Sequence, residues 1–164
     1  MKVAVAVVAP LSVTAGVSEA CAHNTVSARE ERWNDTGQFG FYSNFEGKKP
    51  FPQLGVNISV LEPGQAIGAY HREAAQEGFL VLAGECLAIV EGEEVQLRPW
   101  DYLHCPPGTD HAVLGAGKGP SVVLAVGRRG LPRKGIEYLE DERVPPRSTG
   151  RTRVPYHEGW LPEL

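Results

Sequence analysis

Between residues 55 and 130 the sequence repeats one pattern, in which a short segment rich in Val, Ile, Leu, Phe and Tyr is followed by residues that favour a turn. Such apolar segments are typical of strands, and the Gly, Pro and Asp residues between them favour tight connections. The pattern predicts an antiparallel β domain, and eight segments at this spacing imply a sandwich or a closed barrel. We expect strands at 56–61, 67–72, 78–82, 87–90, 95–97, 102–105, 112–114 and 121–126.

The length of the chain suits one such domain. Its 164 residues include 19 glycines and 13 prolines, a turn-rich composition that stays below the level typical of disorder. We expect the β-barrel to span 55–127, with an N-terminal arm and lead-in over 1–54 packed on it and a charged C-terminal tail over 128–164. Helix is expected only as a short turn near 27–33.

Charge and hydropathy argue against two classes of partner. The 16 Lys and Arg residues against 20 Asp and Glu residues give a net charge of −4 without a basic stripe, so we expect no nucleic-acid partner. No apolar run approaches the ~18 residues that a membrane-spanning helix needs, so we expect no membrane partner. Small molecules are the expected ligands.

The cysteines and the N-terminus bear on the compartment. Cys21, Cys86 and Cys105 contain no CxxC pair, which argues against a disulfide framework and a zinc ribbon and favours a cytoplasmic protein. Cys86 and Cys105 are expected to be buried thiols, although they could approach each other on adjacent strands. The apolar N-terminal segment and the small residues at 20–22 also resemble a secretory signal peptide, which would make the protein secreted. Otherwise the alternating Val and Ala residues at 3–8 form an arm that could add a strand to a sheet or to a partner subunit.

Four residues that can ligate a metal ion lie around the expected turns. On a strand His71 and Glu73 share a face, and Glu77 follows a four-residue step that can return to that face. His111 follows the Pro-Pro-Gly turn at 106–108 and could complete the set from a neighbouring strand. Two imidazoles with one or two carboxylates suit zinc, iron, manganese or nickel, and leave positions open for substrate or water.

Each of these residues also has an ordinary interpretation, since a single histidine on a strand is more often a satisfied or exposed side chain than a ligand. The metal site is favoured because all four are bracketed by apolar strands and by the turn glycines Gly64, Gly84 and Gly108. His104 is expected to face opposite to its apolar neighbours Leu103 and Cys105, as an outer or inter-sheet residue and not as a ligand.

The same residues resemble the two motifs of the cupin superfamily. The first motif is a glycine, five or six residues, His-x-His, three or four residues, a glutamate, six residues and a glycine, and it is matched by Gly64, His71, Glu77 and Gly84. The second motif, Pro-x-Gly-x-x-His, is matched by Pro106, Gly108 and His111. The resemblance covers about 55–127 and implies an all-β fold, a cupin-type antiparallel barrel built as a jelly-roll-like double-stranded β-helix. It also implies that His71, Glu77 and His111 hold one metal ion at the mouth of the barrel.

Three positions depart from the cupin pattern. Glu73 stands where the second histidine usually is, Trp100 replaces the glycine before Asp101, and Gly115 replaces the asparagine that often ends the second motif. If Glu73 ligates the metal, two carboxylates formally neutralise a divalent ion and make it a weaker Lewis acid. If Glu73 turns away, the remaining set of two histidines and one carboxylate is the one that non-haem iron oxygenases use. A barrel that holds no metal is the third alternative.

These observations predict a metal-binding cupin protein that binds or transforms a small oxygen-bearing molecule. If it is an enzyme, a metal-dependent oxidoreductase, dioxygenase or isomerase, the ion would polarise a substrate oxygen or activate oxygen, and Glu73 is the nearest candidate catalytic base. The alternative is a non-catalytic small-ligand-binding or sensing module, because one fold can host both functions. A homodimer is expected, with the arm at 1–10 and the tail after residue 130 as candidate contacts.

Overall fold

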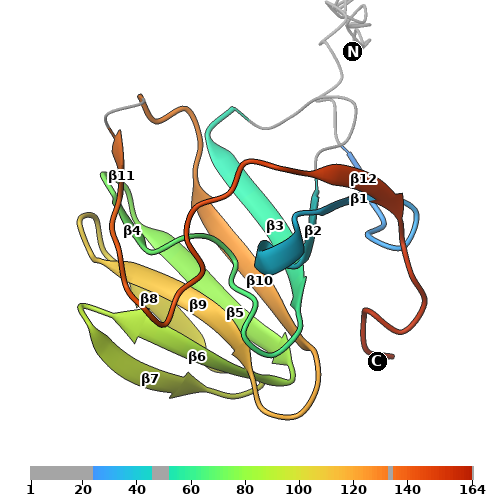
Figure 1. Cartoon of the computed structure of the whole chain (residues 1–164). Helices are drawn as coiled ribbons and strands as arrows, with labels where there is room; N and C mark the ends of the chain where they lie inside the picture. Colours follow the sequence, from blue (N-terminus) through green and yellow to red (C-terminus); the bar gives the residue numbers. More distant parts are fainter. Residues whose placement is uncertain (1–23, 46–51, 133–134, 164) are drawn as a thin grey trace, which may run out of the picture.

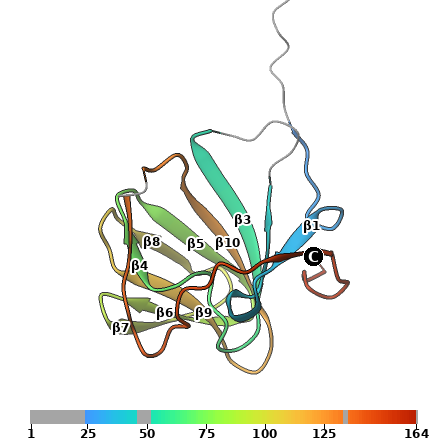
Figure 2. The same ribbon diagram turned by 45° about the horizontal axis from the view of Figure 1, so that its top comes forward.

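The computed structural model describes residues 24–45, 52–132 and 135–163. Almost all regular structure is β, arranged as two antiparallel sheets that face each other (Figure 1). Helical structure in these ranges is limited to short 3-10 turns, of which η1 (Gly37–Phe39) is described in full. The sheets form two separate layers (Figure 2), so the architecture is jelly-roll-like and not a closed barrel. The expected all-β cupin-type fold is confirmed in this form.

The larger sheet has seven strands and the smaller sheet has five. The larger sheet runs in the order β12 (Thr152–Pro155), β1 (Arg32–Asp35), β2 (Phe41–Asn44), β3 (Leu54–Leu61), β10 (Ser121–Arg128), β5 (Glu77–Ala83) and β8 (Tyr102–Cys105). The smaller sheet runs in the order β11 (Ile136–Tyr138), β4 (His71–Glu73), β9 (His111–Ala116), β6 (Glu85–Val90) and β7 (Glu93–Leu97).

The core lies between the two sheets, because alternate residues of the facing strands point inward. Leu61, Phe79 and Val123 come from the larger sheet, and Ala88 and Val113 come from the smaller one; all five are buried in one cluster. This core holds the sheets at a fixed separation, which matters for any site that takes residues from both.

The strand expected over 67–72 is wrong for its first part, because β4 begins only at His71. The segment before it crosses β9 through single hydrogen bonds, from Gly64 N to Gly115 O at 2.9 Å and from Ile67 N to Val113 O at 2.9 Å. Isolated bonds of this kind fix the segment to the sheet without forming a ladder. The chain therefore enters β4 through a series of bends, and His71 is the first residue of that strand.

Strands outside the expected domain lengthen both sheets. β1, β2 and β12 extend the larger sheet, and β11 pairs with β4 at the edge of the smaller one. On the outer face of the larger sheet, Trp33 packs against Trp160 with ring centroids 5.2 Å apart, and Tyr156 completes this aromatic cluster. Figure 1 shows the chain after β11 crossing from the smaller sheet to β12 in the larger one.

Several expectations concern residues that the structure does not describe. The N-terminal arm, the alternative signal peptide and Cys21 all fall within residues 1–23, outside the described residues. Cys86 and Cys105 are described, and both are free thiols buried in the core. No helix in the described part of the chain has the length and apolar character needed to cross a bilayer.

Candidate metal centre

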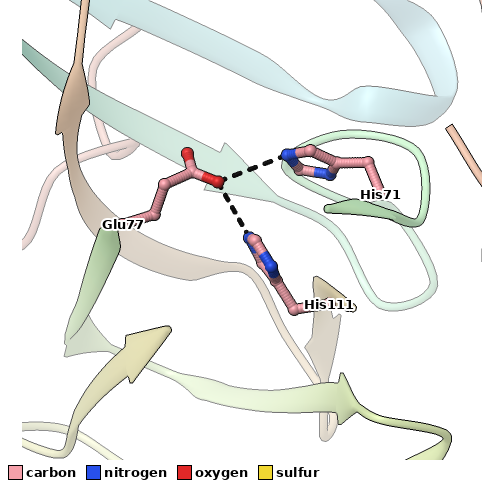
Figure 3. Close-up of side chains that lie close together, drawn as sticks. All are labelled: His71, Glu77 and His111. Atoms are coloured by element: carbon pink, nitrogen blue, oxygen red, sulfur yellow. Dashed lines mark ion pairs between the residues drawn. The ribbon is translucent and has the colours of Figure 1, made fainter. Parts of the chain in front are cut away.

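Three of the four predicted ligands meet at one end of the jelly roll (Figure 3). His71 begins β4 and His111 begins β9, and the two residues are directly opposite each other in the antiparallel pairing of these strands. Glu77 begins β5 in the larger sheet and points toward both imidazole rings. The group therefore bridges the two sheets, and its geometry depends on the core that holds them together.

The potential ligand atoms of this group converge. Glu77 Oε2 lies 3.0 Å from His111 Nε2 and 3.3 Å from His71 Nε2. The ligand atoms of the three residues all lie within 4.8 Å of one another, and the two imidazole rings are 4.7 Å apart between centroids. Because metal–ligand bonds to nitrogen and oxygen are about 2.0–2.2 Å long, one ion between these atoms can contact all three side chains.

Each imidazole ring is oriented by a hydrogen bond at its other nitrogen. His71 Nδ1 lies 2.8 Å from Ala69 O, and His111 Nδ1 lies 3.0 Å from Thr109 O. A carbonyl oxygen can only accept, so both Nδ1 atoms carry a proton and donate it. In the neutral ring the lone pair is then on Nε2, which faces Glu77 in both cases. Hydrogen bonds of this kind typically orient metal-binding histidines.

Two buried atoms that face the centre of the group lack a hydrogen bond of regular geometry with the described residues. His111 Nε2 and Glu77 Oε2 are buried, and neither makes a hydrogen bond of regular geometry with any described residue. Two histidine lone pairs that point at a carboxylate oxygen are unfavourable unless a proton or a cation lies between them. A divalent cation would satisfy all three atoms, so the residues present fit a metal ion.

Without a metal ion, the group contains one side chain with a lowered pKa and one with a raised pKa. Burial raises the pKa of Glu77, but the neighbouring His111 and His71 imidazoles outweigh burial and lower it to about 2. Burial lowers the pKa of His111, but the Cys105 thiol, Glu77 and the Thr109 carbonyl outweigh it and raise that pKa to about 10. At neutral pH the metal-free group therefore pairs an ionised Glu77 with a protonated His111.

Glu73, the fourth predicted ligand, lies beside this group. Its Oε1 is 3.8 Å from His71 Nε2, and its carboxyl group does not belong to the set of ligand atoms within 4.8 Å of one another. Burial and the negative charge of Glu77 raise the pKa of Glu73 above its ordinary value. A carboxyl group with a raised pKa next to a binding site is suited to accept or donate a proton.

The group borders two adjoining cavities, which share part of their lining. The first, which we call the metal chamber, has a volume of about 220 Å³ and is lined by the three candidate ligands together with apolar side chains that include Phe79 and Ala125. The second, the polar chamber, has a volume of about 470 Å³ and shares Asn57, Ile67, Glu77 and Ala125 with the first. Its other charged residues are Glu73, Arg128 and Arg129. It also contains a row of neutral polar side chains from β2 and β3, namely Tyr42, Asn44, Asn57 and Ser59.

Side chains next to the group in sequence mostly point in the direction that alternation along a strand predicts. Tyr70 and Arg72 point away from the group: the Tyr70 hydroxyl accepts a hydrogen bond from Gly92 N, and Arg72 pairs with Asp110 at 2.8 Å. His104 is exposed on β8, as expected. Gln76, which precedes Glu77 in the chain, is exposed, and no hydrogen bond joins these two described side chains.

The two other departures from the cupin pattern have structural counterparts. Trp100 has a φ of 76°, so the chain keeps the left-handed conformation that a glycine would favour there. Gly115 packs against the segment that follows β3, and a Cβ atom at this position would lie 2.6 Å from Glu62 O. A glycine is therefore required where β9 meets the chain that leads to His71.

Two residues at the site were not expected to belong to it. Tyr138 belongs to the segment expected as a charged tail, but it lies directly opposite His71 in the β11–β4 pairing, and its ring is 6.0 Å from the His71 ring. Cys105 was expected only as a buried thiol, but it is opposite Glu77 in the β5–β8 pairing and interacts with His111. Long-range strand pairing places both residues, and no local sequence pattern reveals it.

The chain is similar to known proteins in both sequence and fold. Residues 57–127 match the family described as the cupin domain. No curated protein matches the chain. Among solved structures, the chain is similar to KdgF from Halomonas sp., with 19% identity, a TM-score of 0.58 and coverage of 67% of this chain and 96% of that one. It is also similar to a cupin 2 domain-containing protein from Halorhodospira halophila, with 16% identity, a TM-score of 0.54 and coverage of 62% and 70%.

These comparisons define the family. Through its domain at 57–127, the chain belongs to the cupin superfamily. It spans about half the length of some structures that it matches, as with DMSP lyase DddQ from Ruegeria pomeroyi, of which it covers 50% with 59% of its own length, at 24% identity and a TM-score of 0.47. At such identities the solved structures bear on the fold alone.

Proposed function

We propose that this cupin protein binds one divalent transition-metal ion through His71, Glu77 and His111, and that it acts on a small oxygen-bearing molecule beside that ion. The observation that carries the proposal is the convergence of two Nε2 atoms on a carboxylate oxygen, with no other regular partner for the buried atoms. Zinc, iron, manganese and nickel all accept this ligand set. Three protein ligands leave coordination positions for the bound molecule.

The residues around the group supply the other functions that such a site needs. A bound ion would polarise an oxygen of the molecule. Glu73 lines the polar chamber beside the group, and its raised pKa fits the transfer of a proton to or from a ligand hydroxyl. Phe79 and Ala125 give the metal chamber an apolar wall, while Asn57 and Ser59 offer hydrogen bonds to hydroxyl or carbonyl groups.

The experiment that tests the metal site is elemental analysis of the purified protein after divalent metals have been offered and excess metal removed. The wild-type protein should retain about one equivalent, and His111→Ala should retain less than about a tenth of that. His104→Ala is the matched control, because this histidine is exposed on β8 and lies outside the group. Equal metal content in His111→Ala and the wild type would exclude the proposed site.

A second measurement separates an enzyme from a non-catalytic ligand-binding module. If Glu73 transfers a proton, Glu73→Gln should retain both metal and ligand but lose turnover. If the protein only binds its ligand, the wild type and Glu73→Gln should bind it with similar affinity and neither should convert it. The second result would replace the catalytic proposal by the binding one.

A further inference from the structure

A third cavity adjoins the metal chamber on the side of the C-terminal segment. It has a volume of about 450 Å³ and lies between η1, residues 67–69 and residues 147–151. It shares Ile67, Gly68, Ala69 and Tyr138 with the metal chamber. The two cavities therefore adjoin at these residues.

The charge of this cavity differs from that of the two chambers. Arg147 and Arg151 line it, and no Asp or Glu does. The remaining polar groups of its wall are hydroxyls, contributed by Thr36, Tyr42, Ser148 and Thr149. By contrast, the polar chamber contains Glu73 and Glu77 together with Arg128 and Arg129, and the metal chamber contains Glu77. Of the three cavities, only this one is therefore lined by cationic side chains without a carboxylate.

Arg147 is held close to the candidate metal group without a carboxylate partner. Its Cζ atom lies 4.3 Å from the centroid of the Tyr138 ring, and that ring is 6.0 Å from the His71 ring. No described carboxylate lies within ion-pair distance of Arg147 or Arg151. Stacking on an aromatic ring positions a guanidinium but leaves its N–H donors available. The Tyr138 ring therefore lies between the Arg147 guanidinium, whose N–H donors are available, and the His71 ring.

We propose that Arg147 and Arg151 bind the oxyanion of an anionic small molecule, a carboxylate or a phosphate, whose other end carries the oxygen that enters the metal chamber. This inference rests on the proposed function and names the class of its ligand. Guanidinium groups bind carboxylates and phosphates through paired, charge-assisted hydrogen bonds, which neutral alcohols cannot match. The arginine pair also offsets the repulsion that an anion would meet from Glu73 and Glu77.

The test measures binding of matched probes by calorimetry to the full-length, metal-loaded protein. The probes are ω-hydroxycarboxylates of three to six carbons, the corresponding ω-hydroxyalkyl phosphates, and diols of equal length in which a neutral hydroxyl replaces the anion. The wild type should bind at least one anion series more tightly than the diols, by about tenfold or more. The stronger series distinguishes a carboxylate ligand from a phosphate ligand.

Charge-neutral variants assign this preference to the two arginines. Arg147→Gln with Arg151→Gln should remove the preference for anions while leaving diol affinity within about twofold of the wild type, because only the charge-assisted bonds are lost. Arg153→Gln is the control, since Arg153 is exposed on β12 and lines none of the cavities described above. Equal binding of anions and diols by the wild type, or equal loss in the control, would overturn the inference.

The same samples separate this inference from the proposed function. Metal content should be unchanged in the arginine variants, because neither arginine belongs to the metal group. If the wild type holds no metal, the proposed function fails, and the anion preference measured on the metal-free chain still decides the arginine site. If metal is held and no anion preference exists, the arginine site fails and the metal proposal stands.

Discussion

His71 and His111 lie opposite each other in β4 and β9, and each donates its Nδ1 proton to the carbonyl oxygen of the residue two positions earlier in the chain. The two rings are thus oriented in the same way by their own backbone. Because both strands are fixed in one sheet, the Nε2 atoms are in place before any ion binds. Such preorganisation reduces the ordering that metal binding would otherwise require.

The first prediction concerns proton release. His111 has a pKa of about 10 in the metal-free protein, and Glu77 has a pKa of about 2, so at pH 7.5 His111 is protonated and Glu77 is ionised. Metal binding needs a free Nε2 lone pair and should displace about one proton from His111. The apparent dissociation constant for the metal should therefore rise about tenfold for each unit by which the pH falls below neutrality.

Calorimetric titration with the metal in two buffers of different ionisation enthalpy measures this proton. With one proton released per metal bound, the measured heat should differ between the buffers by about the difference of their two ionisation enthalpies. In His111→Ala this contribution should disappear together with most of the affinity. A heat that is independent of the buffer in the wild type would mean that His111 is neutral before the metal binds.

The second prediction compares Glu77 and Glu73 through the same substitution, glutamate to glutamine. Glu77→Gln should weaken metal binding about 100-fold or more, because it removes the anionic ligand that faces both imidazoles. Glu73→Gln should change the metal affinity less than about tenfold, because Glu73 lies outside the converging atoms and contributes only a nearby charge. Competition titration with a chelator measures both. Equal losses in the two variants would make Glu73 a fourth ligand.

The cupin domain and the grouping of His71, Glu77 and His111 could be predicted from the sequence because both depend on local signals. Short apolar segments and turn residues determine the strands, and Glu77 and His111 each begin a strand next to a tight turn. The two-residue spacing between His71 and Glu73 on one strand predicted the position of Glu73 less well. It shares a strand with His71, but β4 is only three residues long and lies at the end of a bent segment, and the two side chains do not reach the same point.

The remaining parts of the site depend on pairing between distant segments. Tyr138 reaches His71 because β11 adds to the edge of β4, and Arg147 reaches Tyr138 because the chain then returns across the molecule. The sequence beyond residue 130 is charged and interrupted by proline, a pattern that predicts a tail and does not indicate which edge strand it joins. Edge pairing is determined by tertiary packing, so neither residue could be assigned to the site beforehand.

The third prediction tests the close approach at Gly115. A Cβ atom there would lie 2.6 Å from Glu62 O and 3.0 Å from Leu61 Cβ, and both neighbours belong to the core or its backbone. Gly115→Ala should therefore lower the free energy of unfolding by about 1–3 kcal/mol. Gly119→Ala is the control, since nothing lies within 4 Å of its Cβ position, and its effect should stay within about 0.5 kcal/mol. Urea unfolding at a fixed metal concentration measures both, and similar stabilities would show that β9 can move away from residue 62.

The fourth prediction concerns the backbone at Trp100. This residue has a φ of 76° and is 73% exposed, so its side chain contributes little packing while its backbone adopts a conformation that costs roughly 1 kcal/mol for a residue with a Cβ atom. Trp100→Gly and Trp100→Ala both remove the indole ring and both keep the hydrogen bond from residue 100 N to Val81 O. Trp100→Gly should be the more stable of the two by about 1 kcal/mol, because glycine populates this region without a steric penalty.

Tyr102 supplies the control for this comparison on the same edge of the sheet. It is an exposed residue of β8 and does not have a positive φ, so glycine should be less stable than alanine at this position by about 0.5–1 kcal/mol. The expected result is therefore opposite orders of stability for the glycine and alanine variants at positions 100 and 102, measured by thermal or urea unfolding. If alanine were also the more stable residue at position 100, the turn before β8 would have relaxed to a negative φ, and the departure from the cupin glycine would carry no energetic cost.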